Sequence, residues 1–343
     1  MKGRIHDIIN LAGKLTPRRL WNAVKVLYSY YRSRYARSPY LSGMPVALSV
    51  EPTTHCNLRC PECPSGLRKF SRPTGMLTTG LYESVIDELS PDLLYLLLYF
   101  QGEPYLHPQF NELVSYAHKK GIYTATSTNA HYLTDQRCMD TIESGLDRLI
   151  ISIDGATQES YESYRIGGSL DKVLEGTKRL VQWKRKLKSR TPHVIFQFLV
   201  VRPNEHEIEA VKELATEAGV DEVRFKTAQV YDHENGSPLI PTIDKYSRYR
   251  QNPDGKWRIK NKLLDQCWKM WHSSVVTWDG RVVPCCFDKD ATHVFGSVEN
   301  GSSFREIWQS EPYNAFRKAL LTSRSEIDIC RNCTEGTKVW AAG

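Results

Sequence analysis

Short apolar segments alternate with amphipathic segments from about residue 45 onward. Apolar runs of strand length lie at 47–51, 93–100, 122–127, 148–154, 194–201 and 222–226. Between them, apolar residues recur at helical spacing over 80–90, 109–120, 134–144, 170–187 and 205–218. This order predicts six βα units, and hence an α/β fold with a partial (β/α)6 TIM-like barrel. Functional groups are expected where the strands of such a barrel end.

The pattern changes after residue 228, where Pro, Gly and Asn become frequent. Two β-runs, 275–278 and 281–283, are then joined by Asp279-Gly280, which predicts a hairpin. We therefore expect a partial barrel over 45–228, a linker over 229–262 and a small C-terminal hairpin and helix module over 263–343. Residues 1–44 form a separate N-terminal arm.

The N-terminal arm contains a predicted helix, with Thr16 as its N-cap and Pro17 at its first position. Its apolar stripe comprises Leu20, Trp21, Val24, Leu27, Tyr28, Tyr31 and Tyr35. Basic residues occupy much of the remaining surface. Two interpretations stay open: a helix packed on the outside of the barrel, or a helix lying on an anionic membrane surface.

Charge is concentrated in the same arm. The chain has a net charge of +7, and its first 40 residues hold nine Lys or Arg against one acidic residue, Asp7. The rest of the chain is near neutral, so we expect no nucleic-acid partner. The longest apolar run, 93–100, is too short to span a bilayer, and the N-terminus lacks the pattern of a signal peptide. We expect a cytoplasmic protein, with peripheral contact to the inner membrane face through residues 1–40 as an alternative.

The nine cysteines are clustered, which in a reducing compartment indicates metal or redox chemistry. Cys56, Cys60 and Cys63 form a Cys-x3-Cys-x2-Cys run directly after the first predicted strand. Three thiolates leave one iron of a four-iron cluster open, as a reactive site requires. A zinc site completed by a residue such as His55 is the alternative.

This run resembles the hallmark of the radical S-adenosylmethionine (SAM) superfamily. The resemblance implies that Gly102, Glu103 and Pro104 match the motif that receives the methionine amino group. It also implies contacts of Ser152, Asp154 and Arg165 with the ribose or the methionine carboxylate. One position departs from the family pattern, since Glu62 stands where an aromatic residue often packs near the adenine.

A second set of cysteines, Cys267, Cys285, Cys330 and Cys333, supplies four ligands near the C-terminus. Four thiolates by themselves also suit a structural zinc ion. Together with the barrel, the set resembles the auxiliary-cluster module of the SPASM/twitch group, which implies a second [4Fe-4S] cluster.

Two residues beside this set are candidate catalytic groups. Cys286 is an additional ligand, a proton-transfer thiol or a small buried residue, and we favour the buried residue. Asp288 is a candidate general base, with a surface carboxylate as the alternative. The remaining cysteine, Cys138, is expected to lie on a helix face and to be buried in the core.

The resemblance implies an enzyme that reductively cleaves SAM to a 5′-deoxyadenosyl radical and abstracts hydrogen from its substrate, with electrons from a flavodoxin or ferredoxin. We expect a small-molecule or lipid-like substrate and a net oxidation aided by the auxiliary cluster. A peptide- or protein-modifying maturase is the first alternative, although about 40 N-terminal residues are few for a separate peptide-binding domain. A non-enzymatic scaffold or electron carrier is the second.

Overall fold

The structure is a computed structural model that describes residues 2–299 and 301–339. The chain forms two compact units. The first, which we call the cysteine-loop unit, comprises Met1–Ile9, Cys56–Lys69 and Ala125–Lys262. The second, the hairpin unit, comprises Asn10–His55, Phe70–Thr124 and Leu263–Gly343. These units group residues by packing, whereas the predicted domain boundaries follow motifs along the chain and stay a prediction.

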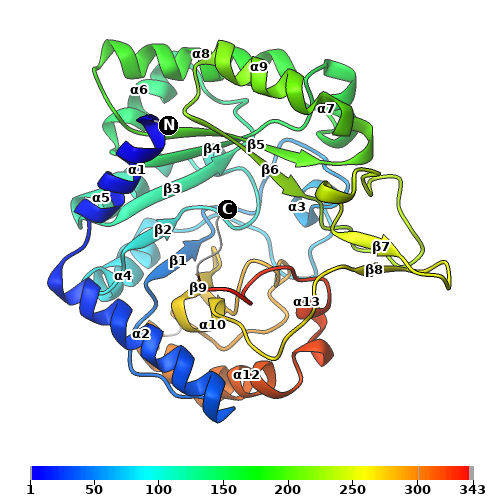
Figure 1. Ribbon diagram of the computed structural model, residues 1–343. Coiled ribbons are helices and arrows are strands. Elements are labelled where there is room, and N and C mark those ends of the chain that lie inside the picture. The colour runs from blue at the N-terminus through cyan, green and yellow to red at the C-terminus, as the bar shows by residue number, and fades with distance from the viewer. Residues whose placement is uncertain (1, 300, 340–343) are drawn as a thin grey trace. The chain divides into compact units, whose positions relative to one another are not determined.

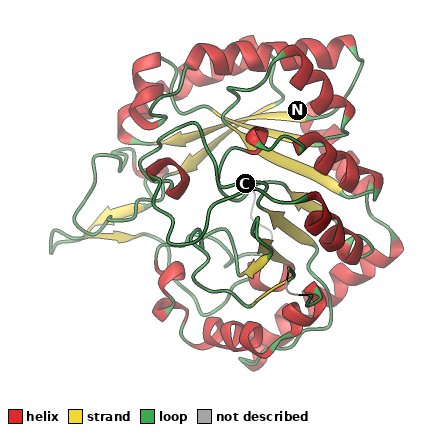
Figure 2. Ribbon diagram, turned by 180° about the vertical axis from the view of Figure 1, so that it is seen from behind, coloured by secondary structure: helices red, strands yellow, loops and turns green. Residues whose placement is uncertain are grey.

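The cysteine-loop unit is built on four parallel strands in the order β3-β4-β5-β6. Their bounds are Tyr123–Thr128, Arg148–Ser152, His193–Val200 and Glu222–Thr227. Four helices connect them: α6 (Asp135–Glu143), α7 (Gln158–Tyr164), α8 (Leu170–Lys186) and α9 (Ile208–Ala218). Helices α8 and α9 run along one face of these strands (Figure 1), and the view from behind shows the same layer of helices outside the strands (Figure 2). Connections of this kind bury both faces of a parallel sheet. Strand β3 is accordingly buried along its whole length, whereas β6, the last strand in the order, is only half-buried.

The same unit contains shorter elements that hold its loops. The cysteine run leads into the one-turn helix α3 (Pro64–Leu67), and the 3-10 turns η2 (Arg202–Glu207) and η3 (Asp244–Tyr246) follow β5 and β6. The segment predicted as a linker contains an antiparallel pair, β7 (Tyr249–Gln251) with β8 (Trp257–Ile259). Tyr249 and Ile240 of this segment are fully buried, so the linker is a packed part of the unit.

The hairpin unit has five strands in the order β11-β10-β9-β1-β2. Strand β1 (Ala47–Val50) pairs in parallel with both β2 (Tyr95–Leu97) and β9 (Ser273–Val276). The predicted Asp-Gly hairpin is confirmed: β9 turns back antiparallel into β10 (Arg281–Val283), which pairs with β11 (Gly296–Ser297). The C-terminal hairpin therefore extends the sheet that contains the first strand of the chain.

Helices complete the hairpin unit. They are α2 (Pro17–Ala36), α4 (Thr79–Leu89), η1 (Pro104–Leu106), α5 (Phe110–Lys119), α10 (Lys269–His272), α11 (Phe304–Gln309), α12 (Glu311–Thr322), η4 (Arg324–Glu326) and α13 (Asp328–Arg331). Helix α1 (Lys2–Gly13) passes from one unit to the other. No described helix is both long enough and apolar enough to cross a membrane.

The N-terminal helix starts as predicted but does not pack as its apolar stripe suggests. The Thr16 side chain accepts a hydrogen bond from the Arg19 amide, and Pro17 opens the helix. The buried residues of α2 are Arg19, Asn22, Val26, Ser29, Tyr30 and Ser33, whereas most of the stripe is exposed. The stripe is therefore not the face that packs on the protein.

Candidate functional site

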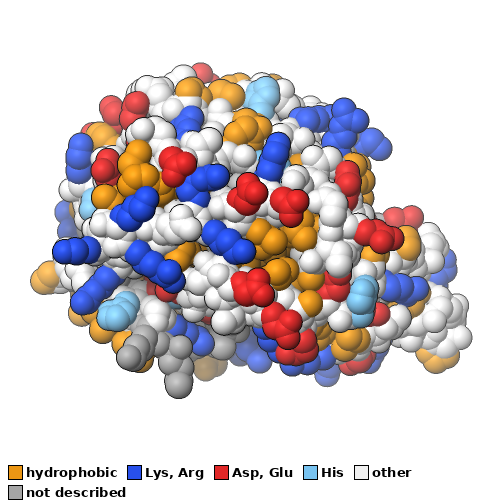
Figure 3. All heavy atoms as spheres, turned by 90° about the horizontal axis from the view of Figure 1, so that it is seen from above, with side chains coloured by type: hydrophobic (Ala, Val, Ile, Leu, Met, Phe, Trp, Pro, Cys, Tyr) orange, Lys and Arg blue, Asp and Glu red, His pale blue; other side chains and the backbone are white. Residues whose placement is uncertain are grey.

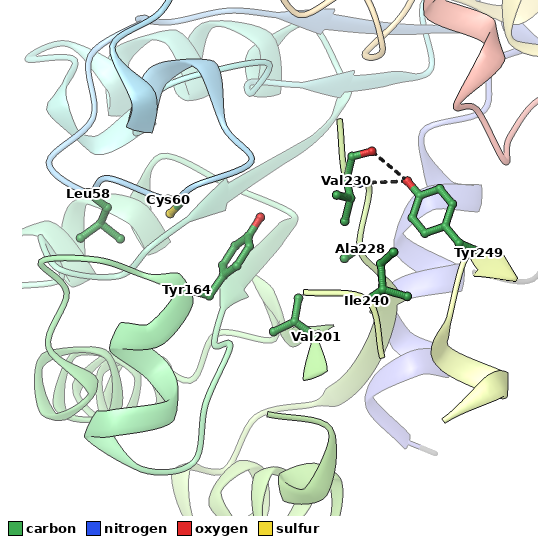
Figure 4. Packing of buried hydrophobic residues seen from close by; sticks show 8 residues of the cluster. All are labelled: Leu58, Cys60, Tyr164, Val201, Ala228, Val230, Ile240 and Tyr249. Atoms are coloured by element: carbon green, nitrogen blue, oxygen red, sulfur yellow. Dashed lines mark hydrogen bonds between the residues drawn. The ribbon is translucent and has the colours of Figure 1, made fainter. Parts of the chain in front are cut away.

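Packing in an apolar cluster holds the loop that carries Cys56, Cys60 and Cys63. Leu58 and Cys60 are buried in an apolar cluster with Tyr164 and Val201, and Cys56 and Cys63 pack against its edge. Figure 4 shows the Tyr164 ring beside Cys60. Apolar side chains inside the loop thus fix the positions from which the three thiols project.

A glycine just after the loop lets the chain fold closely over it. A side chain on Gly66 would place its Cβ 2.5 Å from the Cys60 nitrogen and 2.6 Å from the Cys60 oxygen, which is closer than any real contact. The Arg59 amide also donates to the Ile166 carbonyl at 3.0 Å. These contacts tie the cysteine loop to its own turn and to the segment after α7.

The structure brings Asp154 and Arg165 together at Cys60. Arg165 Nε lies 2.5 Å from Asp154 Oδ2, and Arg165 Nη1 lies 3.7 Å from Cys60 Sγ. Asp154 is fully buried, and its other oxygen accepts from the Leu199 amide at 2.7 Å. Although burial opposes it, the charges of Asp154 and of a Cys60 thiolate raise the pKa of Arg165 well above its ordinary value. Asp154 therefore orients a permanent cation beside a cluster-ligand thiol.

Burial acts on the thiol itself in the opposite sense. It raises the pKa of Cys60, while the nearby Arg165 guanidinium lowers it. Ser152 is buried on β4, two residues before Asp154, and so points to the same side of the extended chain. The cysteine-loop unit thus gathers three of the predicted site residues near one strand end.

The Gly102-Glu103-Pro104 motif lies in the hairpin unit, against the residues that precede Cys56. Gly102 has a φ of 75°, and a Cβ on it would lie 2.2 Å from the Thr53 carbonyl oxygen and 2.8 Å from that of His55. The Glu103 amide donates to the His55 carbonyl at 2.7 Å. Glycine is required here because the two backbones touch.

Glu103 is the buried carboxylate of this motif. Its Oε1 accepts from the Tyr105 amide at 3.2 Å and caps η1, in which Pro104 takes the first position. A capped carboxylate keeps a fixed orientation and remains able to accept further hydrogen bonds through its other lone pairs. This is the chemistry that pairs with an ammonium group.

The C-terminal cysteines also come together, within the hairpin unit. Cys267 precedes α10, Cys285 follows β10, Cys330 lies in α13 and Cys333 directly after it. Burial, and the charge of Cys267 next, raise the pKa of Cys330 to about 12. Burial also raises the pKa of Cys285, to which Cys286 and Cys267 contribute. The charge of Cys267 thus reaches both Cys285 and Cys330, and burial favours their neutral thiols unless a cation is bound nearby.

The chain closes over this site after Cys333. A Cβ on Gly336 would lie 2.5 Å from Cys267 Sγ, and the Trp268 amide donates to the Gly336 carbonyl at 2.6 Å. The Glu335 amide donates to Cys333 Sγ at 3.3 Å. The segment that follows the last cysteine therefore shields the first one.

The donor set fits an iron-sulfur cluster better than one metal ion. Among residues 2–299 and 301–339, no three Cys, His, Asp or Glu side chains converge as the ligands of a single ion do. Ligands of a four-iron cluster bind different iron atoms, so their sulfur atoms lie further apart than around zinc. The C-terminal thiols, of which Cys267, Cys330 and Cys333 are buried, suit such a cluster.

The two candidate catalytic residues, Cys286 and Asp288, differ in exposure and in contacts. Cys286 is exposed, so its interpretation as a small buried residue is wrong. Lys269 Nζ lies 3.6 Å from Cys286 Sγ and pairs with Glu335 at 2.5 Å. Asp288 is buried and accepts hydrogen bonds from the amides of Thr292 and His293, an arrangement that stabilises a turn. Catalytic roles for Cys286 and Asp288 stay predictions.

Several residues of the site were missed by sequence reasoning. Asn129 directly follows β3, and its Nδ2 lies 2.8 Å from Asn57 Oδ1 and 4.0 Å from Cys56 Sγ. Its place after a predicted strand was the available signal. Glu51, directly after β1, forms a fully buried ion pair with Arg72 at 2.6 Å. Cys138, by contrast, is buried on α6 as predicted.

Arg324 is the residue of the C-terminal site that no motif indicated. It is fully buried, its Nη2 lies 3.4 Å from Cys333 Sγ, and its guanidinium donates to the carbonyls of Gln266 and Glu335. The thiolate charges of Cys267, Cys333 and Cys330 raise the pKa of Arg324 despite its burial. An arginine therefore lies beside each cysteine group: Arg165, which is partly exposed, and Arg324, which is buried.

Comparison with known families agrees with this geometry. The family described as "Radical SAM superfamily" matches residues 50–215, and the SPASM "Iron-sulfur cluster-binding domain" matches residues 267–334. The chain belongs to the radical SAM superfamily. It is a member of the SPASM/twitch group, with SAM, a SAM-binding [4Fe-4S] cluster and an auxiliary iron-sulfur cluster as its cofactors.

Similar proteins act on different molecules. The chain is 24% identical over 315 residues to a tungsten-containing aldehyde ferredoxin oxidoreductase cofactor-modifying protein of Pyrococcus furiosus, covering 84% of this chain and 86% of that protein. It is 28% identical over 298 residues to a PqqA peptide cyclase of Rhodopseudomonas palustris, covering 80% and 76%.

Solved structures show the fold. SuiB of Streptococcus suis bound to S-adenosylmethionine has a TM-score of 0.64 at 11% identity, covering 90% of this chain and 75% of that one. BtrN in complex with AdoMet and 2-DOIA has a TM-score of 0.52 at 18% identity, covering 86% and 95%. The predicted partial barrel with a C-terminal cysteine module is confirmed.

Proposed function

We propose that this radical SAM enzyme modifies a peptide, removing hydrogen from a carbon of the peptide with help from the auxiliary cluster. The long alignment with a PqqA peptide cyclase carries the proposal, because it extends over about four fifths of this chain. A SuiB structure bound to its precursor peptide SuiA adds support, with a TM-score of 0.62 over 92% of this chain. These relatives favour a peptide over the small-molecule or lipid-like substrate expected from the sequence.

When bound, the first cluster and SAM supply a 5′-deoxyadenosyl radical that abstracts the hydrogen atom. The chain supplies position and charge. Cys56, Cys60 and Cys63 would hold the cluster, with one iron left for SAM. Glu103, held by the Tyr105 amide, presents a fixed carboxylate suited to an ammonium group.

Arg165 contributes a cation whose orientation Asp154 fixes. A guanidinium placed in this way can pair with a carboxylate and stabilise a cluster-ligand thiolate. In the C-terminal module, Cys267, Cys285, Cys330 and Cys333 would hold the auxiliary cluster. Such a cluster would supply an electron acceptor and so make the modification a net oxidation, and a flavodoxin or ferredoxin would supply the electrons for the first cluster.

A small-molecule oxidation is the second candidate. It is favoured by the likeness to BtrN, whose chain is covered over 95% of its length and whose structure holds 2-DOIA. The two candidates predict substrates that differ in their sensitivity to a protease. Only a peptide substrate is destroyed by a protease.

The test uses deuterium transfer and works with a substrate that has not been identified. The full chain is reconstituted anaerobically with iron and sulfide, reduced with dithionite, and incubated with SAM and a low-mass extract of fully deuterated cells. Deuterium in the 5′-deoxyadenosine product reports hydrogen abstraction from an extract component. We expect the label to disappear when the extract is first digested with a broad protease that is then removed.

Two variants make this result interpretable. Cys60→Ser removes a ligand of the first cluster and should abolish deoxyadenosine formation, whereas Cys138→Ser changes a buried cysteine outside both groups and should retain it. Label that survives digestion would replace the peptide with a small molecule. Absence of deoxyadenosine in the wild type, with the iron content of both clusters intact, would contradict the enzyme itself.

A further inference from the structure

Helix α2 packs on the hairpin unit through its polar side. Arg19 is buried and donates to the backbone carbonyls of Lys14, Ser90, Lys120 and Gly121 at 2.5–3.0 Å. Ser90 and Lys120 are the C-terminal caps of α4 and α5, where carbonyls lack partners within the helix. The guanidinium thus fixes the N-terminal half of the helix to the segments on either side of α5.

Three more polar side chains fix the rotation of α2 about its own axis. Asn22 donates to the Met44 carbonyl at 2.8 Å and accepts from the Met44 amide at 2.9 Å. Ser29 Oγ lies 2.9 Å from Ser42 Oγ, and Ser33 Oγ accepts from the Tyr40 amide at 2.8 Å. Turning the helix to bury its apolar stripe would break all of these bonds, and buried polar groups without partners are costly.

The apolar stripe therefore faces away from the protein. The exposed fractions are 55% for Leu20, 63% for Trp21, 47% for Val24, 57% for Tyr28 and 81% for Tyr35. A single exposed apolar side chain is ordinary on a protein surface, but a row on one helix face marks an interaction site. A protein that buries Arg19 and exposes Trp21 reverses the usual arrangement of a surface helix.

Positive charge accompanies this stripe. Between residues 8 and 50 the chain contains no Asp or Glu. Arg18, Lys25 and Arg32 follow each other at intervals of seven residues and so lie along one flank of the helix. Arg18 is paired with Asp92 and Arg32 lies over the Tyr40 ring at 3.7 Å, so both side chains are held beside the stripe.

This arrangement differs from the charge distribution on another face of the protein. On the face that carries α8 and α9, basic and acidic side chains are interspersed (Figure 3). Trp and Tyr side chains with a row of Arg and Lys at their flank suit the interface of an anionic bilayer, where rings enter the headgroup layer and cations meet phosphates. A second copy of the chain would bring two basic flanks together, which like-charge repulsion disfavours.

We propose that the outward face of α2 docks this enzyme on an anionic membrane surface. The helix lies in the plane of the headgroups, with the stripe inserted and the basic flank on the lipid phosphates. This role is independent of the substrate and of the reaction.

The test is sedimentation of the full-length protein with sucrose-loaded vesicles. One set contains phosphatidylcholine alone, and the other contains phosphatidylcholine and phosphatidylglycerol in equal parts. We expect the protein to sediment with the anionic vesicles, to bind phosphatidylcholine at least about tenfold more weakly, and to be released as salt screens the charges.

Matched variants identify the surface. Leu20→Ser with Trp21→Ser removes two exposed side chains of the stripe and should weaken binding to anionic vesicles by about tenfold or more. Leu187→Ser, an exposed leucine at the end of α8, should leave binding unchanged. Because all three side chains are exposed, circular dichroism and deoxyadenosine formation should match the wild type in every variant.

Three outcomes would overturn the proposal. One is equal binding of the double variant and the wild type to anionic vesicles, and another is equal binding to both vesicle types. The third is a wild-type dimer in light scattering that the double variant converts to a monomer while vesicles sediment neither protein. That result would assign the stripe to contact between copies of the chain.

Discussion

Replacing Gly102 by alanine tests whether close backbone contact positions the Gly-Glu-Pro motif. Gly102 has a φ of 75°, and the added Cβ would lie 2.2 Å from the Thr53 carbonyl oxygen. A left-handed residue other than glycine costs roughly 1–2 kcal/mol. The Thr53 carbonyl would also have to withdraw by about 1 Å to restore van der Waals contact, which adds roughly 1–3 kcal/mol.

Gly255 provides a matched control, because it has a φ of 77° and nothing within 4 Å of its ideal Cβ. Gly255→Ala therefore carries the conformational cost without the clash. At about 2–4 °C per kcal/mol, we expect the melting temperature to fall by roughly 2–8 °C in Gly255→Ala and by roughly 4–20 °C in Gly102→Ala.

Binding of SAM separates a local effect from a general loss of stability. The clash displaces the backbone at Thr53 and His55, so Glu103, which is bonded to His55, should shift with it. Equilibrium dialysis of the reconstituted proteins should show SAM binding weakened at least about tenfold in Gly102→Ala and unchanged in Gly255→Ala, since a displacement near 1 Å is enough for such a loss. Equal melting temperatures and equal SAM affinities in the two variants would refute the reasoning.

Two further predictions concern charge in the hairpin unit. Arg324→Gln removes a cation beside the auxiliary cluster; for a charge separation of about 6 Å and an effective dielectric constant of about 20, the reduction potential of the cluster should fall by roughly 100 mV in an EPR-monitored titration. Arg324→Lys should restore most of this shift, and an unchanged potential in the glutamine variant would remove Arg324 from the redox site. Burial lowers the pKa of His272 to about 4, so the folded protein binds fewer protons than the unfolded chain between pH 4 and 6.5. The contribution of His272 to the free energy of unfolding is therefore fully present above about pH 6.5 and falls by up to about 3 kcal/mol toward pH 4. Chemical denaturation should show a smaller loss of stability toward pH 4 in His272→Gln than in the wild type. An equal loss in the two proteins would exclude His272 as the cause.

The sequence was sufficient for elements whose signal is local. Each predicted strand overlaps an observed one, because strands buried between helices consist of continuous apolar runs. The spacing of Cys56, Cys60 and Cys63 predicts the first cluster site because a ligand loop is contiguous in the chain. The Asp279-Gly280 turn identified the C-terminal hairpin for the same reason.

Features that depend on distant partners were not predictable in this way. Arg19 is buried because carbonyls at Ser90, Lys120 and Gly121 converge on it, and no pattern within α2 reveals this. The periodicity of apolar residues identified the stripe of α2 correctly, but it did not show that this stripe faces away from the protein. Arg324 likewise lies in a short turn, and only the tertiary structure brings it close to Cys267 and Cys333.

Two arginines, one beside each cysteine group, bear on how the potentials of the two clusters would differ. Arg165 stands beside Cys60, but its charge is matched by Asp154 at 2.5 Å. The guanidinium of Arg324 donates to two carbonyls and to Cys333, so its positive charge remains available to the auxiliary site. Positive charge stabilises the reduced, more negative form of a cluster. An auxiliary cluster held by these cysteines would therefore have the higher potential, which would suit it as an electron acceptor.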